Sequence, residues 1–560
     1  DFIIEKMNEH YSAKFEIPFK ETSTKVEDYR AKRITSYLNT VDTIARRTFE
    51  DLKKNVEEKS EEFEKYMEML PEFSELKQSF VNTFQNNTIK TDLTTWIQNN
   101  LKLGSIDVNI MTKLDKVNYR KNEQLPSEFN DAHAALRGFA NSNLESSVIL
   151  SAGMNPRLYS YFEKFNDFFP DENNRLKKKI ILKVSDFRSS IIQGKFLAKK
   201  GLWVSEYRIE SGLNCGGHAF ASDGYLMGPI LEEFKTNKQQ LIEDVHAIFT
   251  NALKSQGKHV PSAPLDLKIT VQGGVGTSEE HEFLLDNYPV ASVGWGTPFL
   301  LVPEATTVDS HTLEVLKKAK EKDLYLSNVS PLGVPFNSLK GSSNDLVKLK
   351  KIEENKAGSP CPKKFLVSNT EYTDKAICTA SKKYQTLKLG ELAQENLDLK
   401  SEEYATKFNA ITVKTCLCEG LSNAALIKNN LEHKGEEQGV AVCPGPNMAY
   451  FSKELSLKEM VHHIYGKTNI MTDMNRPHMF IKELKMYVDY FSKKVDEATG
   501  TLSRKQEKYL NTFYTNLNNG IGYYQDLFLS FESNAEGLIT DLNELKDELF
   551  SIKIPIFAKV

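Results

Sequence analysis

The stretch from residue 210 to residue 218 combines paired glycines with one titratable side chain. It reads Glu-Ser-Gly-Leu-Asn-Cys-Gly-Gly-His, ends on His218 and directly follows an apolar run that begins at Leu202. Paired glycines leave the backbone flat enough for a planar ligand to approach, and an imidazole exchanges a proton near neutral pH. These residue types predict a binding turn that carries one acid–base group.

Two further glycine turns follow along the chain. Residues 271–277 read Val-Gln-Gly-Gly-Val-Gly-Thr, and residues 291–297 read Ala-Ser-Val-Gly-Trp-Gly-Thr. Because glycines let several backbone N–H groups point at one anion, a strand followed by such a turn is suited to a phosphate. The three turns together predict a site for a phosphate-bearing ligand beside His218.

Short apolar runs that alternate with helical stretches must position these turns. The runs predicted as strands are residues 106–110, 147–150, 180–184, 203–209, 267–271 and 290–293. Helices are predicted between them, for example over 188–200 and 279–285. This alternation predicts parallel strands joined by helices, either as a closed barrel or as an open doubly wound sheet. Both architectures bind ligands at the carboxyl ends of their strands.

The chain of 560 residues is too long for one ordinary core, and its composition divides it into four parts. Apolar residues recur at helical spacing from Ile34 to Val56, which predicts a long amphipathic helix. We expect an N-terminal helical region over 1–100, an α/β region over 101–345, a cysteine-rich extension over 346–470 and a C-terminal helical region over 471–560. The helical ends could cover the core or form a homo-oligomer contact.

Charge and hydropathy exclude several classes of partner. Lys and Arg number 72 against 76 for Asp and Glu, so the balance predicts no nucleic-acid partner. No apolar run approaches the roughly 20 residues that span a bilayer, so no membrane association is expected. The first residues also lack the basic-then-apolar layout of a secretion signal, which favours a cytoplasmic location.

The three turns, in their order and intervals, resemble those of the nitronate monooxygenase group, which includes the flavin-dependent enoyl-acyl-carrier-protein reductases. The resemblance covers roughly residues 145–310 and includes Val293 to Leu300 with Glu304 after it. It implies a TIM-type (β/α)8 barrel that binds FMN, here with α-helical extensions at both ends. The chain departs from the family between Met111 and Ser146, where the family fits two further strands, and at Cys215, where it has a small apolar residue.

The resemblance also implies roles for individual residues. His218 matches the histidine that faces the flavin and acts as base or acid, although such a histidine could instead only hydrogen-bond to FMN or to the loop. The implied cofactor-binding residues are Asn109, Met111, Thr112, Lys183, Glu210, Gly216, Gly217, Gly273, Gly274, Gly276, Gly294, Gly296 and Thr297. Among them, those from 273 to 276 and from 294 to 297 match the phosphate turns. Lys183 could reach the flavin or a substrate carboxylate, or form a structural salt bridge.

Five of the six cysteines lie beyond residue 345, which is a distribution typical of a metal site or of buried thiols. They are Cys361, Cys378, Cys416, Cys418 and Cys443. Two are followed by proline, as is common beside iron–sulfur ligands, and thiolate sets of this kind bind iron–sulfur clusters or zinc. A [4Fe-4S] or [3Fe-4S] cluster would serve as a one-electron relay beside a flavin, much as in glutamate synthases. The spacing matches no standard ligand pattern, so zinc and plain buried thiols stay open.

Together these patterns predict an FMN-dependent oxidoreductase that acts on a small organic or acyl substrate, with His218 transferring a proton and NAD(P)H or another donor supplying electrons. Two alternatives remain. A flavin-free barrel lyase or isomerase could hold the phosphate of its own substrate in the same turns. A non-catalytic barrel could instead act as a scaffold for the helical ends.

Overall fold

A computed structural model describes residues 2–55, 60–84, 93–111, 114–151, 153–431, 438–473, 475–498, 502–531 and 535–553. Its centre is a parallel sheet of six strands in the order β1-β4-β5-β6-β7-β8. The strands are β1 (Val108–Ile110), β4 (Ser146–Leu150), β5 (Lys178–Val184), β6 (Val204–Glu210), β7 (Lys268–Gln272) and β8 (Ser292–Gly294). Each of the six predicted apolar runs therefore overlaps a strand of this sheet, with bounds that differ by one or two residues.

The strand order has no reversal, so each new strand adds to the same edge of the sheet. A doubly wound sheet would reverse its order at a switch point, which excludes that alternative for these six strands. Closure into the predicted (β/α)8 barrel is not observed among the described residues, because β1 and β8 stand at opposite edges. The two other described strand pairs are antiparallel: β2 (Tyr119–Arg120) with β3 (Glu123–Gln124), and β9 (Leu324–Ser327) with β10 (Phe336–Leu339).

Helices connect successive strands of the sheet. They are α6 (Asp131–Ala140), α7 (Pro156–Tyr161), α8 (Phe187–Ala198), α9 (Met227–Ser255) and α10 (Ser278–Asn287). Side chains cap several of them: Asp186 accepts a hydrogen bond from the Ser189 N–H at the start of α8, and Thr277 accepts one from the Glu280 N–H at the start of α10. The cap at Thr277 starts α10 directly after the second glycine turn.

The described part of residues 1–100 is mainly helical. It contains α1 (Phe2–Lys14), α2 (Tyr29–Lys54), α3 (Ser60–Glu68), α4 (Glu75–Phe84) and α5 (Leu93–Asn100). Leu38 of α2 belongs to the same apolar core as the sheet, and α2 packs along α6. The first part of the apolar stripe that predicted α2 therefore packs against the α/β region, whereas Phe49 and Leu52 pack in a separate cluster with α3 and α5.

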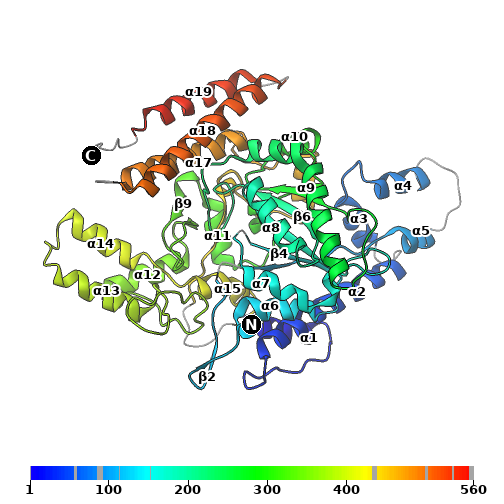
Figure 1. The fold of residues 1–560 in the computed structure, drawn as a ribbon, viewed down its shortest axis with the longest axis horizontal. Coiled ribbons are helices and arrows are strands. Elements are labelled where there is room, and N and C mark those ends of the chain that lie inside the picture. Colours follow the sequence, from blue (N-terminus) through cyan, green and yellow to red (C-terminus); the bar gives the residue numbers. More distant parts are fainter. Residues whose placement is uncertain are drawn as a thin grey trace.

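The rest of the chain is mainly helical. The helices are α11 (Ser310–Lys318), α12 (Ser343–Glu353), α13 (Lys382–Gln394), α14 (Glu402–Thr412), α15 (Leu417–Lys428), α16 (Leu457–Ile464), α17 (Met479–Glu497), α18 (Arg504–Leu529) and α19 (Ala535–Ser551). Helices α17, α18 and α19 lie together along one end of the molecule, and α13 and α14 project from another side (Figure 1). No described helix has a stretch long and apolar enough to cross a bilayer.

One apolar core joins the sheet to the C-terminal helices. Tyr207 of β6, Tyr487 of α17 and Phe513 of α18 are each at most 1% exposed and belong to one cluster. Phe528 at the end of α18 is buried in the same cluster. The aromatic residues of the C-terminal helices therefore pack on the α/β core, which is the first of the two roles considered for the helical ends.

Candidate functional site

The three glycine turns meet at one cavity, at the carboxyl ends of β6, β7 and β8. Its volume is about 480 Å³, within the range of small-molecule sites. The turns contribute Glu210 and 214–217 from β6, 272–275 from β7, and 294–298 from β8. The wall is completed by Leu300, Thr307 and Val308, by residues 441–443 and 445–447, and by the α15 residues Leu421 and Ala424. The sheet thus brings together three turns that the sequence places up to 80 residues apart.

Eight of the predicted cofactor-binding residues line this cavity: Glu210, Gly216, Gly217, Gly273, Gly274, Gly294, Gly296 and Thr297. Lys183 stands beside them, with its Nζ 3.1 Å from Oε2 of Glu210. Glu210 also accepts a hydrogen bond of 2.7 Å from the side chain of Gln272. Lys183 therefore offsets the one carboxylate of the cavity wall.

The remaining predictions fall outside the cavity wall. Asn109 lies in β1 with an exposed side chain, and Met111 is also exposed; neither lines the cavity. Thr112 lies outside the described residues. Gly276 stands behind the second turn, where its N–H donates to Glu280.

His218 adjoins the cavity through Gly217, but its own side chain is not part of the wall. Its Nε2 lies 2.7 Å from the hydroxyl oxygen of Ser330, and its ring packs edge-on against Phe336 of β10. The backbone around it pairs with the same strand, since Ala219 donates to Pro335 and Asn337 donates to Gly217. The β9–β10 hairpin therefore fixes His218.

Close approach explains why these turns need glycine. Gly273 and Gly274 have φ of +108° and +81°, a region that side chains rarely adopt. A Cβ at Gly274 would stand 2.2 Å from Nδ2 of Asn214, and a Cβ at Gly216 would stand 2.6 Å from the carbonyl oxygen of Cys443. Gly274 of the second turn is thus packed against the side chain of Asn214 in the first turn, and Gly216 is packed against the backbone of Cys443.

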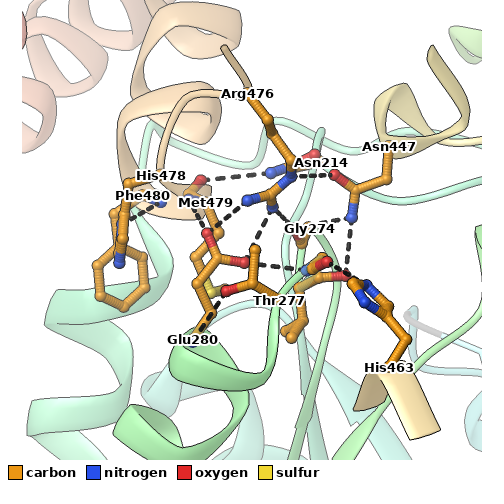
Figure 2. Close-up of polar contacts among 12 residues, drawn as sticks. Asn214, Gly274, Thr277, Glu280, Asn447, His463, Arg476, His478, Met479 and Phe480 are labelled. Atoms are coloured by element: carbon orange, nitrogen blue, oxygen red, sulfur yellow. Dashed lines mark hydrogen bonds and ion pairs between the residues drawn. The ribbon is translucent and has the colours of Figure 1, made fainter. Parts of the chain in front are cut away.

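A buried network holds the second turn from behind (Figure 2). Arg476 forms an ion pair with Glu280, 2.7 Å from Nη1 to Oε1, with both side chains 4% exposed. Arg476 also donates to the carbonyl of Gly274 at 2.5 Å, and Asn447 donates to the carbonyls of Gly274 and Val275 at 2.8 and 2.7 Å. We call these three side chains, Arg476, Glu280 and Asn447, the turn clamp.

The turn clamp lowers the pKa of Glu280 and fixes the orientation of the peptide between Gly274 and Val275. Burial raises the pKa of Glu280, but the charge of Arg476 and hydrogen bonds outweigh it and hold that pKa below its usual value. Because C=O and N–H of one trans peptide point in opposite directions, the N–H of Val275 points away from Arg476. In the described part of the chain, the N–H groups of Gly274, Val275 and Gly296 meet no acceptor. They are available to an anion.

Sequence reasoning missed the turn clamp and a buried carboxyl behind the first turn. Glu483 of α17 accepts hydrogen bonds from the Ser211 hydroxyl at 2.5 Å and from the Met227 N–H at 2.9 Å. Burial raises the pKa of Glu483 to about 7. Arg476, Asn447 and Glu483 come from segments about 170 to 270 residues beyond the turns they support, and each stands in no recognisable motif. No local pattern in the sequence marks them.

The five predicted metal-ligating cysteines separate into two places. Cys443 lines the cavity, as does Cys215, whereas Cys361, Cys378, Cys416 and Cys418 lie in the segment before it and near α15. Within the described residues, no group of three or more histidine, cysteine, aspartate and glutamate side chains is arranged to hold a metal ion.

No protein-family model matches the chain, and no curated protein matches it. The resemblance to nitronate monooxygenases therefore depends on the three turns.

Proposed function

We propose that the cavity binds FMN and that the protein is an FMN-dependent oxidoreductase acting on a small organic or acyl substrate. One observation carries the proposal: three glycine turns at the carboxyl ends of adjacent parallel strands enclose one cavity. This is where parallel α/β folds bind phosphate-bearing cofactors. The absence of a strand-order reversal is also what a (β/α)8 barrel requires, and we propose that the sheet is part of one.

The residues of the cavity fit the two ends of FMN. N–H groups of Gly274, Val275 and Gly296 would hold the phosphate, since the wall contains no lysine or arginine and backbone donors are suited to anions. Gly216 and Gly217 present backbone without side chains to a flat ring. When bound, FMN supplies hydride and electron-transfer chemistry.

The rest of the wall suits the proposed substrate. Leu300, Val308, Leu421, Ala424 and Val442 give it an apolar part, which would take an acyl chain or a small organic molecule and exclude water. His218, beside Gly217, is the proposed proton-transfer group at the substrate. A donor such as NAD(P)H is part of the proposal.

Gly296 permits a direct test of the cavity. A Cβ at this position meets no atom within 4 Å, and the same holds for Gly104, an exposed glycine away from the cavity. Gly296→Leu should therefore fill the cavity without disturbing the fold, with Gly104→Leu as the matched control. We expect the fluorescence of FMN to fall when it binds to the wild type and to Gly104→Leu. Gly296→Leu should bind FMN at least about tenfold more weakly, a loss of about 1.4 kcal/mol in binding free energy.

Riboflavin, which lacks the phosphate, tests the role of the glycine turns. Charge-assisted hydrogen bonds are about twice as strong as neutral ones, so riboflavin should bind at least about tenfold more weakly than FMN. Equal affinity for both would contradict the phosphate assignment. A protein that binds phosphate esters in a Gly296-dependent way but takes no flavin would favour the lyase or isomerase.

A further inference from the structure

One row of residues crosses the cavity at the carboxyl ends of three neighbouring strands. Glu210 ends β6, Gln272 ends β7 and Gly294 ends β8, and the register of the sheet pairs each with the next. All three line the cavity, and we call them the cavity floor. Because paired residues on adjacent strands point to the same face of a sheet, the side chains of Glu210 and Gln272 lie side by side.

Lys183 holds the carboxylate of the cavity floor in place. Its Nζ lies 3.1 Å from Oε2 and 3.5 Å from Oε1 of Glu210, and the two side chains are 18% and 21% exposed. Gln272 donates from Nε2 to Oε1 of Glu210 at 2.7 Å. These contacts fix the direction of the carboxylate, and the ammonium group of Lys183 offsets its charge.

Part of the hydrogen-bonding capacity of the cavity floor is left over. A carboxylate has about four acceptor positions, and Lys183 and Gln272 occupy at most three of those of Glu210. Within the residues that the structure describes, the Gln272 side chain makes this one hydrogen bond, which leaves its Oε1 and its second N–H. A Cβ at Gly294 would stand 3.1 Å from Cβ of Gln272 and 3.4 Å from its Oε1, so the glycine keeps that side of the amide clear.

We propose that Glu210 and Gln272 form a hydroxyl-binding subsite, and that the ligand of the cavity carries a hydroxylated chain beside its phosphate. A hydroxyl group both donates and accepts hydrogen bonds, so it can donate to the Glu210 carboxylate while it accepts the second N–H of Gln272. A cationic ligand gains little here, because Lys183 already offsets the charge of Glu210. The inference rests on the proposed function for the position of the phosphate at the second glycine turn.

The short distance along the chain places these hydroxyls close to the phosphate. Gln272 precedes Gly274 by two residues, which separates their Cα atoms by at most about 7 Å. A ligand whose phosphate lies on the second turn therefore has its hydroxyls within a few bonds of the phosphate. FMN meets this requirement through its ribityl chain, and a sugar phosphate meets it as the substrate of the alternative lyase or isomerase. A phosphate ester with a plain hydrocarbon chain does not.

Two phosphate esters of equal charge test the subsite. Ribitol 5-phosphate carries hydroxyls along its chain, and ethyl phosphate carries none. We expect the whole chain, freed of any ligand that it carries, to bind ribitol 5-phosphate at least about tenfold more tightly than ethyl phosphate, because two added hydrogen bonds account for such a factor. Isothermal titration calorimetry measures both affinities.

Gln272→Met keeps the length of the side chain and removes its amide. The variant should bind ethyl phosphate as the wild type does, which also shows that it is folded, and its preference for ribitol 5-phosphate should fall below about threefold. Gln239→Met is the matched control, since Gln239 is an exposed glutamine of α9 that likewise donates to a glutamate, Glu243, at 2.7 Å. This control should keep the full preference.

The affinities of the wild type are decisive even where Gln272→Met does not fold. Equal binding of the two esters, or binding of neither at millimolar concentration, would overturn the subsite, as would a preference that Gln272→Met retains. FMN binding is measured separately. A chain that binds FMN but does not prefer the hydroxylated ester would refute the subsite alone, and a chain with a Gln272-dependent preference that binds no FMN would refute the proposed function alone.

Discussion

At the scale of single residues, Glu483 makes the strongest prediction about stability. Its carboxyl is fully buried behind the first glycine turn, and burial raises its pKa to about 7 from 4.5. The folded state therefore retains this proton at pH values where the unfolded chain has released it. Such a group stabilises the fold fully below about pH 4.5, and its contribution falls as the pH rises to about 7.

Glu483→Gln should remove this pH dependence, because glutamine does not titrate. Between about pH 5 and pH 7, we expect the free energy of unfolding of the wild type to fall relative to that of the variant by on the order of 1 kcal/mol per pH unit. Urea denaturation at several pH values measures the difference. Glu402→Gln, at the exposed start of α14, is the control. Parallel pH curves for wild type and Glu483→Gln would show that the carboxyl is not protonated in the fold.

His218 makes the residue-scale prediction about turnover. If it transfers a proton at the substrate, His218→Ala should lower the rate by roughly 10²–10⁴-fold while FMN stays bound, because acid–base catalysis contributes about this much. Ser330→Ala removes the hydrogen-bond partner of the ring and should have a smaller effect. A structural role predicts the opposite pattern: similar, small losses for both variants and an unchanged pH–rate profile for His218→Ala.

At the scale of elements, the second glycine turn depends on the turn clamp. Arg476→Met would leave the buried carboxylate of Glu280 without its charge partner and should destabilise the fold by about 3–5 kcal/mol. The double variant Glu280→Gln/Arg476→Met should recover part of this loss, since it removes both charges. Thermal and urea denaturation would measure both. Lys407→Ala, which breaks an exposed ion pair with Glu395, should leave stability unchanged; an equal loss there would contradict the argument.

The sequence was sufficient to predict the elements whose signal is local. Apolar runs such as 180–184 identify their strands, and a glycine turn after each of the last three strands identifies the carboxyl edge where the cavity lies. Arg476 and Asn447 carry no such signal, because their role depends on the fold bringing them against carbonyls about 200 and 170 residues away. The direction of the His218 side chain was equally unpredictable, since it is set by the β9–β10 hairpin.

At the scale of the whole molecule, the C-terminal helices belong to the core of the α/β region. The sequence predicted a separate helical region from residue 471, because composition changes there. Yet Leu484, Tyr487 and Phe491 of α17 are buried in one cluster with the sheet. Composition cannot reveal which apolar surfaces pack against each other. The boundary at residue 471 is therefore a change in sequence pattern, and the apolar core continues across it.

A chain that ends at residue 502 tests this shared core. It lacks α18 and α19 and so exposes the aromatic face of α17, including Phe491, which stacks on Phe513. We expect this chain to aggregate or to lose its cooperative unfolding transition, because burial of such side chains contributes roughly 1.5–3 kcal/mol each. An unchanged melting temperature would show that the C-terminal helices form an independent unit.

The most direct test of the central claim is the identity of the ligand that the purified wild-type protein carries or takes up. The account predicts flavin absorbance bands, release of FMN identified by its mass on denaturation, and loss of both in Gly296→Leu but not in Gly104→Leu. A wild-type protein that carries no flavin and binds none when titrated with FMN would contradict the account.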